Sequence, residues 1–160
     1  MKNKNCAPRI IIFIFVLLLL AFPLFSYDIA KENMNSNMLL MIIDEKFGEN
    51  AFFDDENDLI IEYDGIYFLV QIDSDRAFLK FSSQWKALES ISMSDAYEIV
   101  NTWNSETVFS TVFFWNGRFC LEYFMSFEGG LNSENFNDTL HWLYSIASAL
   151  DDVLKEKGVI

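Results

Sequence analysis

VFSTVFFWNGRFCLEYFM, residues 108–125, is the stretch that decides the fold. Asn116-Gly117 separates two runs that are rich in β-branched and aromatic residues, and this dipeptide favours a type I′ turn because both central positions require positive φ. A two-residue turn dictates the pairing on either side of it, so Trp115 is expected to face Arg118. We therefore predict a β-hairpin that pairs residues over the whole of this stretch.

The predicted pairing sorts the side chains of the hairpin onto two faces of a sheet. One face carries apolar pairs such as Val112 with Leu121, and we expect it to line the core. The opposite face mixes aromatic with polar side chains, which is typical either of a face partly covered by a helix or of an interface. Its aromatic and basic members are Phe109, Phe113, Trp115, Arg118 and Phe124.

A helix is predicted immediately before the hairpin. Ser94 is a suitable N-cap, apolar residues from Ala96 to Trp103 recur at spacings of three and four, and Asn104 is a natural stop. Asn101 and Asn104 could bind a ligand, but we favour a structural role in which they close the helix and satisfy backbone groups where the chain enters the hairpin.

A long helix is predicted after the hairpin. Gly129-Gly130 should turn the chain by supplying positive φ or a close approach between elements. Asn132 or Ser133 can then cap a helix whose broad apolar face is expected to lie across a sheet.

The N-terminal half is predicted to add one helix, over residues 37–47, and three strands, over residues 59–63, 66–72 and 77–81. The acidic run at 54–58 lacks the spacing of a calcium-binding EF-hand loop and is predicted to be solvated. The predicted order is α-β-β-β-α-β-β-α, an α+β domain over residues 37–157 in which helices pack on a five-stranded antiparallel sheet. Residues 27–36 are expected to form a loose entry segment.

The N-terminus is typical of a secretory signal peptide. Lys2, Lys4 and Arg9 precede an apolar run over residues 10–21, which is short for a membrane-spanning helix. We predict cleavage after Ser26, so that residues 1–26 are removed and the protein is exported to the periplasm or secreted. The alternative is an uncleaved segment that anchors the chain to the inner membrane.

Charge and composition narrow the classes of function. Residues 27–160 hold eight basic and 24 acidic side chains, a net charge of −16, which disfavours nucleic acid as a partner. His141 is the single histidine, Cys120 is the single cysteine left after export, and no nucleotide-binding or G-x-S-x-G motif occurs. We therefore predict no catalytic residues, no metal and no cofactor. A catalytic pair of carboxylates is not excluded among the 24 acidic residues, but no spacing selects one.

The C-terminal half also carries a family resemblance. The sequence Val100-Asn101-Thr102-Trp103-Asn104, the Asn116-Gly117 hairpin, the run Glu128-Gly129-Gly130-Leu131 and the capped final helix follow one another in this order. This progression resembles the YbjN-like family of bacterial sensory transduction regulators. The resemblance implies a type III secretion chaperone-like fold, a regulatory role and no enzymatic activity. Chaperones of that fold bind partner proteins through helix and sheet surfaces and often dimerise.

Together these observations predict an exported, non-enzymatic protein-binding module with a regulatory or chaperone-like role. The partner is a protein of unknown identity, or a second copy of the chain in a homodimer, and a membrane is a partner only if the N-terminal segment is not cleaved. The alternative is a small-molecule sensor or hydrolytic enzyme with a pocket between sheet and helices. The candidate interaction surface is the mixed face of the hairpin with the flank of the last helix, and it comprises Phe109, Phe113, Trp115, Arg118, Phe124 and Trp142.

Overall fold

The computed structural model describes residues 28–160, so the predicted signal peptide lies outside the described residues. Ordered along the chain, the elements are β1 (Asp28–Ile29), the 3-10 helix η1 (Lys31–Asn33), α2 (Ser36–Ile42), α3 (Glu45–Gly48), β2 (Ala51–Phe53), β3 (Leu59–Tyr63), β4 (Ile66–Asp73), β5 (Phe78–Lys86), α4 (Met93–Glu106), β6 (Thr111–Trp115), β7 (Arg118–Ser126), β8 (Leu131–Asn132) and α5 (Ser133–Glu156).

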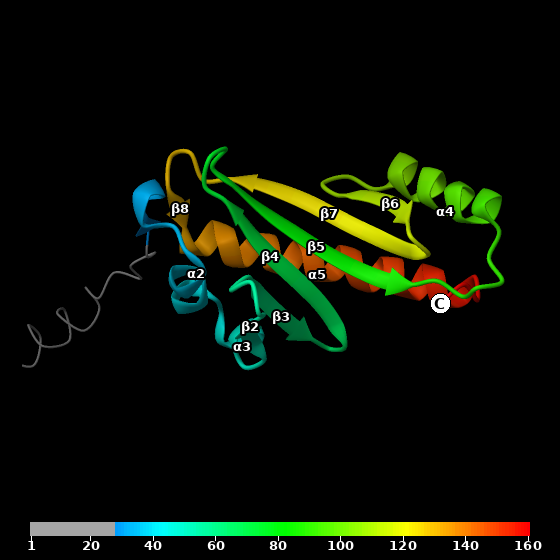
Figure 1. Ribbon diagram of the computed structural model, residues 1–160, viewed down its shortest axis with the longest axis horizontal. Coiled ribbons are helices and arrows are strands. Elements are labelled where there is room, and N and C mark those ends of the chain that lie inside the picture. Colours follow the sequence, from blue (N-terminus) through cyan, green and yellow to red (C-terminus); the bar gives the residue numbers. More distant parts are fainter. Residues whose placement is uncertain (1–27) are drawn as a thin grey trace, which may run out of the picture.

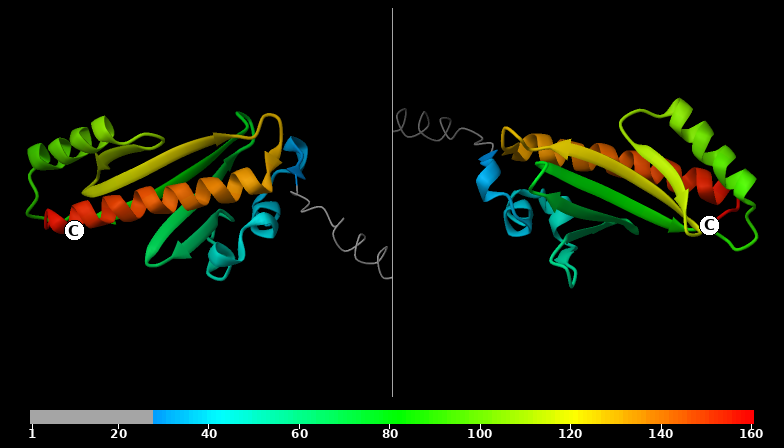
Figure 2. Two further views of the ribbon diagram at one scale, coloured as in Figure 1. Left: turned by 180° about the vertical axis from the view of Figure 1, so that it is seen from behind. Right: turned by 45° about the horizontal axis from the view of Figure 1, so that its top comes forward.

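The main sheet is antiparallel and has the strand order β2-β3-β4-β5-β7-β6. The long helix α5 crosses one face of this sheet, and α4 lies beside the edge strand β6 (Figures 1 and 2). The predicted α+β architecture is confirmed. No helix within residues 28–160 is long and apolar enough to cross a membrane.

The strand count differs from the prediction, because the main sheet has six strands rather than five. The additional strand β2 pairs only three residues with β3, too few to produce a recognisable alternation of apolar and polar residues. β5 also continues beyond the predicted end at Phe81 to Lys86, because β7 pairs with it along its whole length. A further pair, β1 with β8, ties the start of the described chain to the entry of α5.

The predicted helix over residues 37–47 is two helices, and the structure shows why. Asn137 of α5 inserts its side-chain amide at the break: its Oδ1 accepts a hydrogen bond from the Asp44 N–H (2.6 Å), and its Nδ2 donates to the Ile42 carbonyl (2.7 Å). Asp44 then caps α3 by accepting from the Lys46 N–H (3.0 Å). The helix is interrupted because a distant side chain satisfies the backbone groups that the break leaves open.

The hairpin register predicted from Asn116-Gly117 is confirmed from Thr111↔Glu122 to Trp115↔Arg118. Its extension toward Val108 is wrong, because β6 begins only at Thr111 and the positive φ of Phe109 (71°) is not that of a strand residue. At the neighbouring helix, Ser92 rather than Ser94 accepts the capping hydrogen bond from Asp95.

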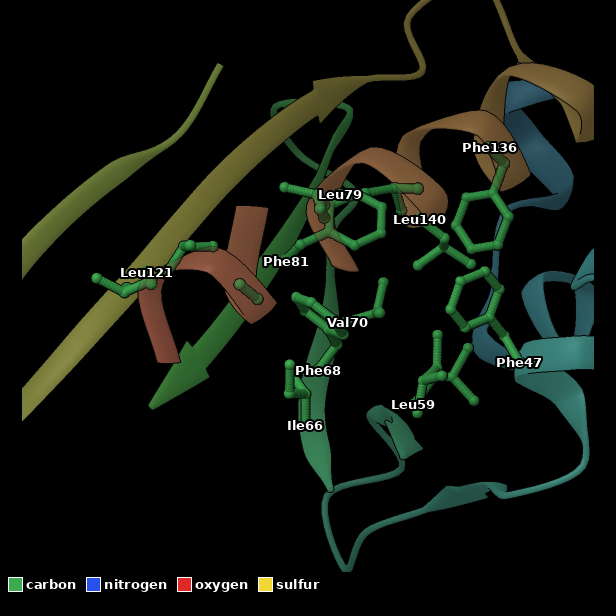
Figure 3. Close-up of a cluster of buried hydrophobic side chains, with 14 of the residues drawn as sticks. Phe47, Leu59, Ile66, Phe68, Val70, Leu79, Phe81, Leu121, Phe136 and Leu140 are labelled. Carbon is green, nitrogen blue, oxygen red and sulfur yellow. The ribbon is translucent and has the colours of Figure 1, made fainter. Parts of the chain in front are cut away.

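The core lies between the sheet and α5. Alternate residues of the central strands point toward the helix and are fully buried, and they meet a row of apolar residues on α5 (Figure 3). Phe81 of β5 contacts Phe136 of α5 with ring centroids 6.0 Å apart. Near the other end of α5, the Trp85 indole donates a hydrogen bond to Asp151 (3.0 Å).

Candidate protein-interaction surface

The face of the main sheet opposite α5 is uncovered, and we call it the open face (Figure 1). The strand register assigns its residues, because side chains alternate between the two faces along each strand. The large hydrophobic side chains that this face exposes to solvent are Phe52, Tyr67, Phe78, Trp115 and Phe124.

The two faces of β6 and β7 differ strongly in the solvent exposure of their aromatic and apolar side chains. Phe119 and Leu121 of β7 point toward α5 and are 0% exposed, whereas Phe124 of the same strand is 56% exposed and Trp115 at the hairpin tip is 65% exposed. Exposed aromatic rings on several neighbouring strands form the kind of surface that protein interfaces use for their anchors.

The paired strand positions of the open face carry no net charge, although the protein is strongly acidic. The charged side chains that the register places on it are three basic and three acidic residues, and Lys80 and Glu122 pair at 3.7 Å. Residues 27–160 as a whole carry a net charge of −16. Another protein can therefore approach this face with less electrostatic repulsion than elsewhere on the molecule. The six residues are Glu62, Asp73, Lys80, Lys86, Arg118 and Glu122.

The structure divides the predicted interaction residues between two places. Phe113, Trp115, Arg118 and Phe124 lie on the open face. The remaining two, Phe109 and Trp142, do not, because their rings stack against each other on the flank of α5 with centroids 5.5 Å apart. Phe109 leaves the sheet where its φ becomes positive, so its predicted position opposite Phe124 is wrong.

Three aromatic residues of the open face, Phe52, Tyr67 and Phe78, are missing from the set proposed from sequence. One signal could have found Tyr67. The turn at Asp64-Gly65 has the same chemistry as the turn at Asn116-Gly117, and its register pairs Glu62 with Tyr67 on one face. Phe78 and Phe52 lie in hairpins whose turns, residues 74–77 and 54–58, are longer than two residues, so the turn sequence alone does not dictate the register.

Cys120 and His141, two potentially reactive side chains, are each engaged in structural contacts or buried. Burial raises the pKa of the Cys120 thiol, which keeps it protonated and poorly nucleophilic. His141 Nε2 lies 3.3 Å from Asp44 Oδ2, and the neighbouring Ser145 hydroxyl donates to the His141 carbonyl rather than to its ring.

Asp44 has an altered acidity that its structural role explains. The Lys46 backbone N–H and then the His141 ring stabilise its carboxylate and hold its pKa below the usual value. Residues 28–160 contain no cluster of three or more histidine, cysteine or acidic side chains that could hold a metal ion.

Residues 44–156 match the model of the YbjN family, described as "Putative bacterial sensory transduction regulator". The chain belongs to the YbjN family. The structure is also similar to the crystal structure of YbjN from E. coli, itself described as "a putative transcription regulator", with a TM-score of 0.67 and 12% sequence identity over 82% of this chain and 96% of that chain. Among curated proteins, none matches this sequence.

The family match begins at Asp44, so β1, η1 and α2 precede the part of the chain that the YbjN family model covers. The strands that form the open face all belong to the matched part, since β2 through β7 lie within residues 44–156. At 12% identity the similarity to the E. coli protein concerns the fold, and the residues of the open face have to be argued from this chain alone.

Asn104 closes the outer edge of this YbjN-family sheet. Its Nδ2 donates to the Val112 carbonyl (2.7 Å), and its Oδ1 accepts from the Val112 N–H (2.9 Å). A single side chain thus occupies two of the backbone groups that an added strand would use, which hinders unwanted pairing with the edge strand β6. Asn101, one turn earlier, is exposed and has no side-chain hydrogen bond within the described part of the chain.

We expect the Asn104→Ala variant to lower the free energy of unfolding by about 1–3 kcal/mol, because two hydrogen bonds are lost and the backbone groups of a buried residue lose their partners. Asn101→Ala is the matched control: it makes the same change in the same helix and should stay within about 0.5 kcal/mol of the wild type. Urea denaturation followed by tryptophan fluorescence measures both. Equal losses in the two variants would show that the Val112 contacts contribute nothing.

Proposed function

We propose that this YbjN-family protein is an exported, non-enzymatic regulator that binds another protein through the open face of its sheet. The observation that carries the proposal is the combination of solvent-exposed aromatic rings and charge neutrality on one uncovered face. Membership of a family of regulators supports the regulatory role. The N-terminal basic and apolar segments support export.

The open face has the composition of a protein interface rather than that of an ordinary solvated sheet. Antiparallel sheets with one solvated face usually alternate apolar residues inside with polar residues outside. Here the outside positions include Tyr67, Phe78 and Phe124 on three different strands, with Lys80 beside Phe124. Aromatic anchors interspersed with paired charges are typical of transient protein–protein interfaces.

The alternative of a small-molecule sensor or hydrolytic enzyme requires a pocket between the sheet and α5. Within residues 28–160, the residues that meet in this layer are large, apolar and fully buried (Figure 3). No observation favours this second function, and protein binding remains the proposal.

The test compares what the chain retains from its native cell envelope. A C-terminally tagged full-length chain serves as bait in three forms: the wild type, the double variant Trp115→Ser/Phe124→Ser, and the control Tyr97→Ser. Tyr97 is an aromatic residue of similar exposure (50%), but it lies on α4, away from the open face. We expect the wild type and the control to retain the same protein and the double variant to lose it.

Retention of the same proteins by all three baits would overturn the proposal. If the retained protein is the chain itself, sedimentation equilibrium of the purified wild type and double variant measures the homodimer directly. The intact mass of the bait tests export in the same experiment, since cleavage after Ser26 leaves a chain that begins at Tyr27.

A further inference from the structure

Three aromatic rings surround the ammonium group of Lys46. Its Nζ lies 4.5 Å from the ring centroid of Tyr63, 5.5 Å from that of Tyr144 and 5.6 Å from that of Phe47. The rings come from three elements, since Phe47 belongs to α3, Tyr63 ends β3 and Tyr144 lies in the middle of α5. We call these three residues the aromatic cage. It is separate from the open face, because Tyr63 and Phe47 belong to the α5 side of the sheet.

The aromatic cage is held together without the help of Lys46. Tyr63 and Tyr144 meet edge to face with centroids 4.7 Å apart, and Phe47 meets Tyr63 in the same way at 5.2 Å. Phe47 is fully buried, and the Tyr144 hydroxyl donates to Asp64 Oδ2 (3.0 Å). A site whose walls are positioned by their own contacts binds a ligand without an ordering cost.

Lys46 is a displaceable occupant of this site, because its ammonium contacts the aromatic rings and, within the described part of the chain, forms no ion pair. Among residues 28–160 its ammonium has no carboxylate at salt-bridge distance, although the chain is strongly acidic. The residue is exposed at the surface, and its flexible stem can swing the ammonium into water. A primary ammonium is strongly hydrated, so water replaces part of the attraction that it loses when a ligand displaces it from the rings.

We propose that the aromatic cage is a binding site for a trimethylammonium group and that Lys46 occupies it in the absence of ligand. A quaternary ammonium has no N–H to hydrogen-bond with water and is attracted to the faces of aromatic rings, which is how aromatic cages recognise choline and related cations. Asp64, bonded to the cage through Tyr144, adds a negative charge close to the site. This site is independent of the proposed protein interface.

The Lys46 ammonium competes with the ligand because both occupy the same three rings, and its attachment to the protein keeps it close to them. If the ammonium occupies the cage about 90% of the time, the apparent affinity for a ligand falls about tenfold. Removing the ammonium should therefore strengthen ligand binding, whereas a purely structural lysine would have no such effect.

The test measures choline binding by isothermal titration calorimetry at constant ionic strength, with ammonium chloride as the control cation. We expect Lys46→Ala to bind choline about tenfold more tightly than the wild type, and Lys46→Ala/Tyr144→Leu to lose this binding. Lys46→Ala/Tyr144→Phe keeps the ring and removes only the hydroxyl, so it should retain most of the affinity. Circular dichroism verifies that each variant is folded.

The proposal is overturned if Lys46→Ala binds choline no better than the wild type, or if the Tyr144→Leu change leaves binding intact in a folded protein. It is also overturned if ammonium competes as well as choline. Co-sedimentation with phosphatidylcholine vesicles distinguishes the source of the group once choline binding is established: binding to vesicles assigns a lipid headgroup, and its absence assigns a free solute.

Discussion

Replacing Phe81 with alanine is expected to lower the free energy of unfolding by about 3–5 kcal/mol. Phe81 lies in the central strand β5, is 0% exposed, and contacts Phe136 of α5 and Tyr123 of β7. The substitution removes a whole ring from the layer between sheet and helix and leaves a cavity that its neighbours can fill only in part. Since domains of this size are stable by about 5–15 kcal/mol, the variant should unfold at a much lower urea concentration.

The matched control is Phe124→Ala, the same chemical change on the other face of the sheet. Phe124 pairs with Lys80, the residue beside Phe81, but its ring is 56% exposed and packs little. We expect a loss within about 0.5–1 kcal/mol for this variant. Urea denaturation monitored by tryptophan fluorescence gives both values. Similar losses would contradict the description of Phe81 as buried under α5 and of Phe124 as exposed on the open face.

Replacing Gly130 with alanine is expected to cost about 2 kcal/mol or more. Gly130 has a φ of +92°, a conformation that residues with a Cβ rarely adopt, and an added Cβ would lie 2.9 Å from the Ile29 carbonyl oxygen. Relief of this clash would require β1 to move away from β8, whose pairing joins Ile29 to Leu131.

Gly129→Ala provides the control for this prediction. Gly129 is the preceding residue, its φ is not in the positive region, and no atom lies within 4 Å of an added Cβ. Thermal unfolding followed by circular dichroism should show a large decrease in Tm for Gly130→Ala and little change for Gly129→Ala. A large decrease in Tm for both variants would contradict a specific role for the positive φ of Gly130 and its close approach to Ile29. It would indicate that the turn needs two flexible residues.

The two Asx-Gly turns show how far local sequence predicts this fold. Asn116 and Asp64 both adopt positive φ, as do the glycines that follow them, and each turn determines the pairing of its two strands. The apolar spacing of the last helix likewise predicts its buried face, and Asn132 caps it as expected. These features depend on residues that are neighbours in the chain, where turn chemistry and periodicity act.

The candidate site was predicted in part, for the same reason. Phe113, Trp115, Arg118 and Phe124 lie within a few residues of a turn, and their common face follows from the register. Phe109 precedes the first paired residue, Thr111, because the strand begins three residues later than predicted, and its ring therefore lies against Trp142 of α5 rather than on the open face. Phe52 and Phe78 lie in hairpins with turns of five and four residues, for which the register cannot be derived from the turn alone.

By itself the sequence determined the α+β class, the two tight hairpins, the capped C-terminal helix and the apolar row that this helix buries, because each of these arises from contacts within a few residues. Only the tertiary structure decided that Asn137 interrupts the first helix, that Asn104 closes the sheet edge, and that Phe47, Tyr63 and Tyr144 enclose Lys46. These arrangements join residues far apart in the chain, and their free energy depends on packing and hydrogen-bond geometry that appear only when the elements assemble.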